Sequence, residues 1–124
     1  MKHYSWKKDN FLVSTDTQLL DINAIHHFLT HSHWAKGISK EAVRQIGFAR
    51  VITDYVTFGY VCDVYVIEAY RKQGLGKWLM ECCHQHPSIQ GLRRLLLITS
   101  SAPWLYQRMG YMPVNKPNYI WQKQ

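Results

Sequence analysis

The segment from Val64 to Lys77, which reads VYVIEAYRKQGLGK, constrains the fold more than any other part of this 124-residue chain. Its first four residues are β-branched or aromatic, as residues in strands commonly are. A basic turn with two glycines follows, and a helix over Gly76–His86 begins immediately after it, with Leu75 and Leu79 along one side. A strand that leads directly into a helix in this way predicts a mixed α/β domain.

The turn in this segment has the features of a phosphate-binding site. The first backbone N–H groups of a helix lack partners within the helix, and the helix dipole favours an anion there. Gly74 and Gly76 leave the backbone open to a ligand. Positive charge is added by Arg71, Lys72 and Lys77. These residues predict a diphosphate site, and a plain strand-to-helix turn with solvated basic side chains is the alternative.

Two well-known phosphate loops do not fit this turn. A Walker A loop requires a hydroxyl residue after its lysine to bind magnesium, and here Trp78 follows Lys77. The dinucleotide pattern GxGxxG requires a third glycine where this chain has Leu79. Both nucleotide-binding classes are therefore excluded.

The rest of the chain supplies further elements for one central sheet with helices around it. We find no repeat, low-complexity segment or flexible linker, so residues 1–124 are expected to form a single domain. Residue patterns predict strands over Phe11–Thr15, Ile46–Thr53, Tyr60–Ile67, Leu92–Thr99 and Asn118–Trp121, and helices over Asp21–Trp34, Ser39–Arg44, Gly76–His86 and Ser101–Gly110. The second and third strands suit an antiparallel pair. The fourth is a continuous apolar run, which is typical of a strand buried on both faces.

The composition narrows the classes of protein that fit. The net charge of +7 is spread over scattered lysines and arginines, which favours a solvated surface with one anion site over a nucleic-acid-binding arm. No apolar run approaches the roughly 20 residues of a membrane-spanning helix, and the basic N-terminal stretch leads into no apolar signal segment. The cysteines are too few, and odd in number, for a disulfide framework, so we expect reduced thiols in a cytoplasmic protein.

The turn and its flanks resemble the GNAT superfamily of N-acetyltransferases. The family's acetyl-CoA signature, Arg/Gln-x-x-Gly-x-Gly/Ala, is matched by Arg71, Gly74 and Gly76. The family's preceding strand, Val-x-Val-x-x-x-Tyr-Arg, is matched by Val64, Val66, Tyr70 and Arg71. Downstream, Ala102–Tyr111 is similar to the family's closing helix, which carries Leu-Tyr and ends in Gly-Phe/Tyr. The resemblance covers Ile46–Pro113 and implies a GNAT-like fold, a central mixed sheet flanked by helices.

The resemblance also implies that the chain uses acetyl-CoA as co-substrate and acetylates a primary amine by direct attack. In the family, pantetheine lies along the strand before the signature turn and pairs with its backbone, while N–H groups of the turn hold the pyrophosphate. One backbone N–H, near Val64 here, faces the thioester oxygen where negative charge develops. The implied cofactor site comprises Val64, Tyr65, Val66, Arg71, Lys72, Gln73, Gly74, Leu75, Gly76 and Lys77. Direct transfer leaves Cys62, Cys82 and Cys83 without a nucleophilic role.

Two residues are candidates for proton transfer. Tyr106 matches the family tyrosine that protonates the departing thiolate, a step that suits a phenol with a pKa of about 10. Its alternative is a core tyrosine on an amphipathic helix. As the base for the acceptor we favour Asp63, because a carboxylate in an otherwise apolar strand usually has a reason to be there. Glu68, Asp54 and a water chain remain open as alternatives.

A cluster of histidines lies in the first predicted helix. His27 and His31 are four residues apart on one face, with His26 and His33 beside them. Zinc takes a third or fourth protein ligand, and no cysteine or carboxylate lies at finger-like spacing. The pattern is not HExxH, because Phe28 replaces the glutamate. We therefore expect no metal site, and histidines that line the acceptor side of the cleft or face solvent.

The N-terminal half is shorter than the family pattern. Only Gly37–Gln45 separates the first helix from Ile46, so one strand of the usual hairpin is missing. The sheet is then one strand short, or Phe11–Thr15 pairs directly with Ile46–Thr53, or a second chain fills the gap. Because an open strand edge is a template for another chain, we predict a homodimer. A catalytically weak acetyl-CoA sensor or docking module of the same fold is the alternative function, and the acceptor amine stays unnamed.

Overall fold

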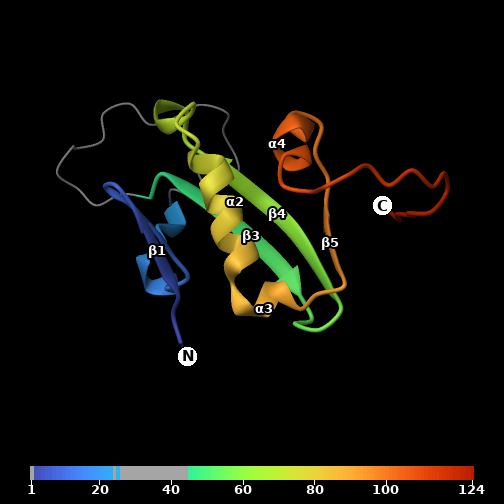
Figure 1. The fold of residues 1–124 in the computed structure, drawn as a ribbon, viewed down its shortest axis with the longest axis horizontal. Helices are drawn as coiled ribbons and strands as arrows, with labels where there is room; N and C mark the ends of the chain where they lie inside the picture. Colours follow the sequence, from blue (N-terminus) through green and yellow to red (C-terminus); the bar gives the residue numbers. More distant parts are fainter. Residues whose placement is uncertain (1, 24, 26–44) are drawn as a thin grey trace.

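The described part of the chain contains two separate sheets. A computed structural model describes residues 2–23, 25 and 45–124. The first sheet pairs β1 (Ser5–Lys8) with β2 (Phe11–Ser14), and the second has the order β3 (Gly47–Thr53), β4 (Phe58–Val66), β5 (Arg94–Leu97). β3 and β4 are antiparallel, whereas β4 and β5 are parallel. The predicted mixed α/β class and the predicted antiparallel hairpin are confirmed (Figure 1).

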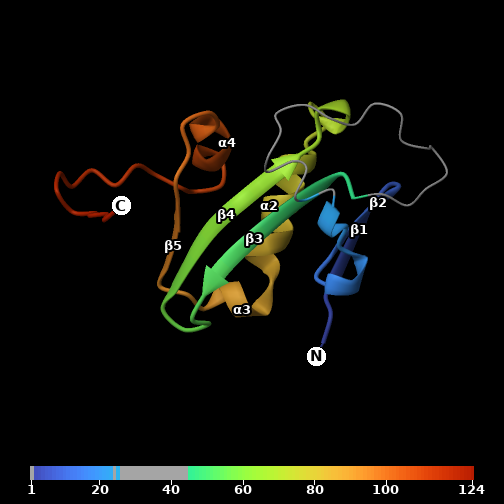
Figure 2. The same cartoon turned by 180° about the vertical axis from the view of Figure 1, so that it is seen from behind.

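Helices cover one face of the three-stranded sheet. The described helical segments are η1 (Thr17–Leu19), η2 (Glu68–Tyr70), α2 (Leu75–Gln85), α3 (Pro87–Gln90) and α4 (Pro103–Gln107). Figures 1 and 2, which view the molecule from opposite sides, show α2 lying across one face of β3 and β4. None of the helices in the described part has the length and apolar character that a bilayer-spanning helix requires.

The core lies between α2 and the sheet. Its buried apolar residues are Val61, Tyr65, Ile67, Leu75, Met80, Cys82 and Ile89. Two leucine side chains lie close to Gly59, so that a Cβ there would be 2.7 Å from Cδ2 of Leu95 and 3.0 Å from Cδ1 of Leu92. A larger residue at position 59 would therefore require these leucine side chains to shift.

The β1–β2 hairpin packs beside α2 instead of joining the main sheet. The ring of Tyr4 lies edge-on to His86 at 4.8 Å between centroids, and Phe11 meets Tyr70 in the same way at 6.3 Å. The sequence predicted the second strand of this hairpin and missed the first. Direct pairing of Phe11–Thr15 with Ile46–Thr53 is wrong, because the partner of β2 is β1.

The predicted helices over Asp21–Trp34 and Ser39–Arg44 fall largely outside the described residues. Within the described residues, β4 is the one strand that pairs with β3, so the opposite edge of β3 has no strand beside it. The expectation of a sheet lacking one strand concerns Gly37–Gln45, which lies almost entirely outside the described residues, so it stays a prediction.

Two predictions for the C-terminal third are wrong. Residues 118–121 form no strand; a turn and irregular backbone occupy this stretch, and Trp121 is 81% exposed. Strand residues need a neighbour to pair with, and the described tail has none, while Pro113 and Pro117 interrupt any regular ladder. The strand predicted over Leu92–Thr99 was expected to be buried on both faces. Instead β5 spans only four residues and is half-buried, because it lies at the edge of the sheet and helices cover one face.

Candidate active site

A β-bulge interrupts β4 near its C-terminal end. Phe48 pairs with Tyr65 and Arg50 pairs with Cys62, so β4 has one residue more than β3 between these pairs. Asp63 lies in this extra length with a φ of 54°, in the left-handed region that Asp tolerates better than most residues. Because a bulge bends its strand, β4 changes direction just before the glycine turn.

The pairing of β4 with β5 ends before the bulge. Its last pair is Val61 with Leu97, while β4 continues to Val66. No strand within the described residues pairs with this edge beyond Val61, and an extended ligand can pair with such an edge as an added strand. The sequence predicts pantetheine along Val64–Val66, in the part of β4 that extends past its last pair with β5. The side chain of Tyr65 is buried and its hydroxyl accepts a hydrogen bond from Gln45 at 2.9 Å, so only its backbone can reach a ligand.

The turn after β4 presents backbone N–H groups at its surface. Lys72 and Gly74 both adopt left-handed conformations, with φ of 66° and 75°. Turns of this kind form concave sites for anions. Gly74 makes no side-chain cap at the start of α2, so the first N–H groups of α2 receive no acceptor from it. The side chain of Arg71 fixes the turn to β4, because its Nε donates to the carbonyl oxygen of Val66 at 2.8 Å.

The residues of the predicted phosphate site differ in how exposed they are. Arg71, Lys72, Gln73 and Gly74 are exposed, whereas Leu75 is buried and can offer only its backbone N–H. At Gly76 an added Cβ would have only Cγ2 of Val66 within 4 Å, at 3.9 Å. Lys77 pairs with Glu81 one turn later, at 3.8 Å between Nζ and Oε1.

Tyr106 lies on α4, which begins at Pro103 and is followed by a left-handed Gly110 with φ of 93°. Within the described residues its hydroxyl has no hydrogen-bond partner. Burial raises the pKa of Tyr106, so the phenol keeps its proton at neutral pH. A half-buried phenol that keeps its proton is suited to act as an acid.

The glycine turn and α4, the helix that carries Tyr106, lie at the same end of the main sheet. Figures 1 and 2 both show η2, the start of α2 and α4 at the end where β4 finishes. Asp54, one of the alternative bases, lies in the hairpin link at the opposite end of β4. Its carboxylate accepts hydrogen bonds from the Thr57 hydroxyl and the backbone N–H groups of Val56, Thr57 and Phe58, which hold its pKa well below the usual range. Asp54 therefore stabilises the hairpin link.

Asp63, the favoured base, is ion-paired in this structure. Nη2 of Arg50 lies 2.8 Å from its Oδ2, and both side chains are partly exposed. Arg50 thus holds the carboxylate of the bulge from the neighbouring strand. Arg50 was not predicted from the sequence, because its position opposite the bulge depends on a strand register that no local pattern reveals.

A groove of about 1120 Å³ lies beside β5, between that strand, α4 and the tail after Gly110. Tyr106 forms part of its wall together with His84 and Tyr111. Nε2 of His84 lies 2.8 Å from the hydroxyl of Tyr111, a contact across 27 residues of sequence. His84 was not predicted from the sequence, because its place in the last turn of α2 gives no signal of this distant partner.

No metal cluster is found in the described part of the chain, where His, Cys, Asp and Glu nowhere gather in a group of three. The histidines from His26 to His33 lie outside the described residues, so their predicted place beside the acceptor cleft stays a prediction. Cys62, Cys82 and Cys83 are all free thiols.

Comparisons with known proteins identify the family. The model of the GNAT acetyltransferase domain matches residues 25–113, well over half of the chain. The chain belongs to the GNAT family of acetyltransferases. A crystal structure from Xanthomonas campestris, of a protein assigned to that family, has a TM-score of 0.77 and 36% identity, and the match covers 100% of this chain and 94% of that one.

Two further relatives agree with this assignment. A protein of Gibberella zeae assigned as an acetyltransferase is 28% identical over 144 residues, which cover 85% of this chain and 80% of the relative. The structure of a probable acetyltransferase from Staphylococcus aureus has a TM-score of 0.55 at 28% identity and covers 64% of this chain and 61% of that one. The resemblance noted at the glycine turn is therefore confirmed, and the matched residues include the bulge, the turn and α4.

Proposed function

We propose that this GNAT protein transfers an acetyl group from acetyl-CoA to a primary amine, which attacks the thioester directly. The observation that carries the proposal is that the pairing of β4 with β5 stops at Val61 while β4 continues to Val66, and that the left-handed turn before α2 follows after η2. An edge of this kind suits an extended arm, and a turn of this kind suits a diphosphate. Pantetheine and pyrophosphate have these two shapes, in this order, within CoA.

In this proposal the backbone holds most of the co-substrate. The N–H near Val64 faces the thioester oxygen and stabilises the negative charge that develops there. Tyr65 and Val66 contribute main-chain groups to the pantetheine arm. The N–H groups from Lys72 to Lys77 hold the pyrophosphate, and the basic side chains of the turn add attraction for it.

Two side chains carry the proton transfers. A proton leaves the acceptor ammonium for Asp63, directly or through water, and the free amine forms the new C–N bond. As the C–S bond breaks, Tyr106 donates its hydroxyl proton to the sulfur, the nitrogen of the adduct loses its second proton to solvent, and Tyr106 regains a proton from solvent. Because Arg50 pairs with Oδ2 of Asp63 at 2.8 Å, the proton goes to Oδ1, or to Oδ2 once Arg50 has moved away.

The same ion pair favours the second candidate function, a sensor that binds acetyl-CoA with little turnover. A carboxylate that stays bound to Arg50 leaves the acceptor without Asp63 as a base. The two functions share the co-substrate site and differ only in whether an amine is acetylated.

A thiol-release assay with a panel of amines tests the proposal. The panel spans small polyamines, amino acids, amino sugars and lysine peptides, each with saturating acetyl-CoA. We expect at least one class to accelerate release of the CoA thiol in proportion to protein concentration, and Asp63→Asn to slow it. Binding of acetyl-CoA without acceleration by any amine would replace the enzyme with the sensor.

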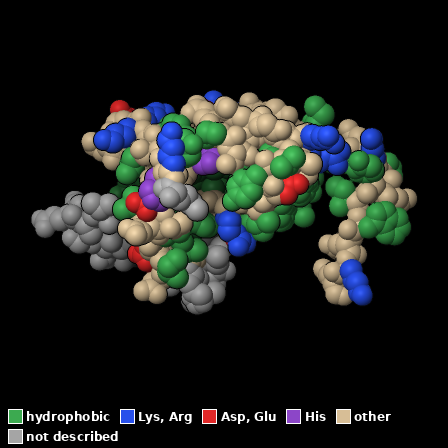
Figure 3. All heavy atoms as spheres, turned by 90° about the horizontal axis from the view of Figure 1, so that it is seen from below, with side chains coloured by type: hydrophobic (Ala, Val, Ile, Leu, Met, Phe, Trp, Pro, Cys, Tyr) green, Lys and Arg blue, Asp and Glu red, His purple; other side chains and the backbone are tan. Residues whose placement is uncertain are grey.

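We also propose that the protein forms a homodimer in the cytoplasm. The free edge of β3 within the described residues supports a dimer, as does Ile52 on that strand, which is 54% exposed. Figure 3 shows further apolar side chains exposed on the projecting C-terminal segment, where Met112 and Trp121 are each 81% exposed. The three free thiols support a reducing compartment.

A further inference from the structure

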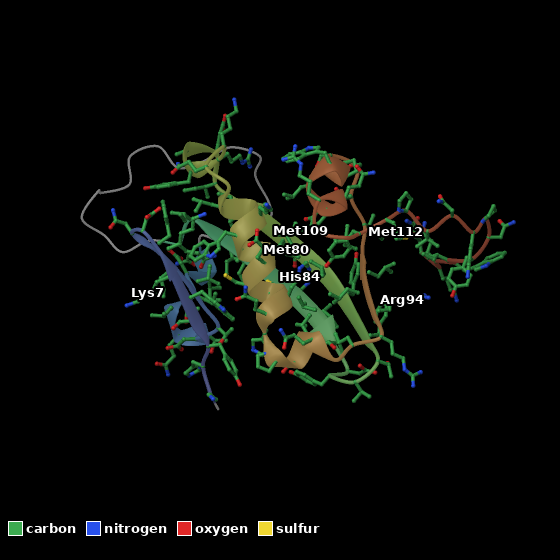
Figure 4. The ribbon with its side chains drawn as sticks, viewed as in Figure 1. Lys7, Met80, His84, Arg94, Met109 and Met112 are labelled. Carbon is green, nitrogen blue, oxygen red and sulfur yellow. The ribbon has the colours of Figure 1, made fainter. Side chains whose placement is uncertain are left out.

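His84, Tyr111 and Tyr106 form a chain of contacts that leads from α2 to the proposed acid. Nε2 of His84 lies 2.8 Å from the hydroxyl of Tyr111. The ring of Tyr111 in turn lies edge-on to that of Tyr106, with 5.6 Å between centroids and 74° between planes. Figure 4 shows His84 on the side of α2 that faces α4. We call these three side chains the His84 cluster.

Few other contacts fix α4 within the described residues. The helix has five residues, no buried side chain and no side-chain cap. Its start has one local hydrogen bond, from the N–H of Ala102 to Oγ1 of Thr99 at 3.1 Å, in the segment between β5 and α4. Its end is held through the backbone, where the N–H of Tyr111 donates to the carbonyl of Tyr106 at 3.0 Å. The hydroxyl of Tyr111 is the side-chain group that joins this end to another element.

We infer that His84 is a positioning residue for Tyr106, acting through Tyr111 to fix the tyrosine hydroxyl at the departing thiolate. The inference rests on the proposed function, because it assigns a role to His84 in the same transfer reaction. His84 does not touch the acetyl group or the sulfur. It holds Tyr111 against the Tyr106 ring, and α2 also carries the phosphate turn at its start, so one helix places both the co-substrate and its acid.

The surroundings of His84 keep this contact intact at neutral pH. Burial lowers the pKa of His84 despite the nearby charge of Glu81, so the imidazole is neutral and can share a proton with Tyr111. Burial also raises the pKa of Tyr111 to about 12, with smaller effects of Cys83 and Tyr106. A neutral imidazole and a neutral phenol can form one hydrogen bond, in which the imidazole tautomer decides which of them donates, and such a bond suits a positioning role.

Substitutions at both ends of this bond test the inference. Tyr111→Phe removes the hydroxyl and keeps the ring against Tyr106, and His84→Phe removes the partner. Each should lower kcat by about 10-fold, since a small misplacement of a reacting group can cost up to about 100-fold, while KM for acetyl-CoA stays unchanged. His84→Gln, whose amide can restore the hydrogen bond, should recover most of the loss. Tyr119→Phe is the matched control, because it removes a hydroxyl from the same groove without touching Tyr106.

The decisive arm repeats Tyr111→Phe and His84→Phe in a protein that already carries Tyr106→Phe. If His84 acts through Tyr106, neither change lowers kcat further, because the hydroxyl that they position is gone. An equal loss in both backgrounds would make the His84 cluster merely structural, and full turnover of Tyr111→Phe in the wild-type background would also overturn the inference. Whichever result is found, the proposed function still stands if the single substitution Tyr106→Phe lowers turnover relative to the wild type.

Discussion

Replacement of Gly76 by valine is expected to weaken acetyl-CoA binding by roughly 100-fold with little effect on the free protein. A Cβ at this position meets only Val66 Cγ2, at 3.9 Å, so the fold has room for the new side chain. Valine and glycine differ by a few tenths of a kcal/mol in helix propensity, which leaves the free protein stable within about 0.5 kcal/mol. The added methyl groups instead occupy the space over the first turn of α2 that the pyrophosphate needs.

The size of the effect follows from the hydrogen bonds that the phosphate would lose. A hydrogen bond to a charged group contributes about 1.5–3 kcal/mol, so the loss of one or two weakens binding by roughly 100-fold. Acetyl-CoA at 100 times its dissociation constant stabilises the wild-type protein by about 2.7 kcal/mol, or roughly 11 °C in Tm for a chain of this length. The variant at the same concentration gains about 0.4 kcal/mol, or roughly 2 °C.

Thermal denaturation with and without acetyl-CoA measures both quantities in one experiment. Gly91→Val is the matched control, since Gly91 also has open space around an added Cβ and lies at the end of α3, away from the turn. The control should keep the full shift in Tm. An equal shift for Gly76→Val and the wild type would refute the placement of the pyrophosphate at the start of α2.

Four other changes have defined outcomes. Tyr106→Phe should lower kcat by about 100-fold while the acetyl-CoA dissociation constant, measured by titration, stays the same; loss of binding instead would make Tyr106 structural. Asp63→Asn should lower turnover and change Tm by less than about 4 °C, because a partly exposed ion pair contributes at most about 1 kcal/mol to stability. Unchanged turnover would show that Asp63 is not the base. Burial lowers the pKa of His84 from its ordinary 6.5, so protonation of His84 favours unfolding. The Tm should therefore fall as the pH drops below about 6.5, and it should fall less in the His84→Gln variant. An equal fall in both proteins would show that another group is responsible. Sedimentation should show a dimer that Ile52→Lys converts to a monomer, and a wild-type monomer of 14.7 kDa would contradict the proposed homodimer.

The sequence predicted the elements whose patterns are local. The hairpin of β3 and β4, the helix α2 and the turn between them follow from β-branched runs, helical spacing and glycines that lie within a few residues of one another. The family was predicted for the same reason, since the residues that carry the resemblance are close in sequence. The two left-handed residues of the turn, Lys72 and Gly74, then show how the backbone forms a concave site there.

Features that depend on strand register or on distant contacts could not be predicted. The bulge at Asp63 exists only in relation to β3, and Arg50 reaches it from that strand. His84 and Tyr111 are brought together by the crossover through α3 and β5. The strand predicted over Asn118–Trp121 failed for a related reason, because strand-forming residues need a partner strand and the described chain offers none.

A single-turnover experiment with protein in excess over acetyl-CoA tests the direct transfer most sharply. Mass spectrometry follows three species, which are acetyl-CoA, the best amine of the panel and the intact protein. The account predicts that acetylated amine appears at the rate at which acetyl-CoA disappears, while the mass of the protein stays unchanged. Acetyl groups that accumulate on the protein, or that remain on CoA with every amine tested, would contradict it.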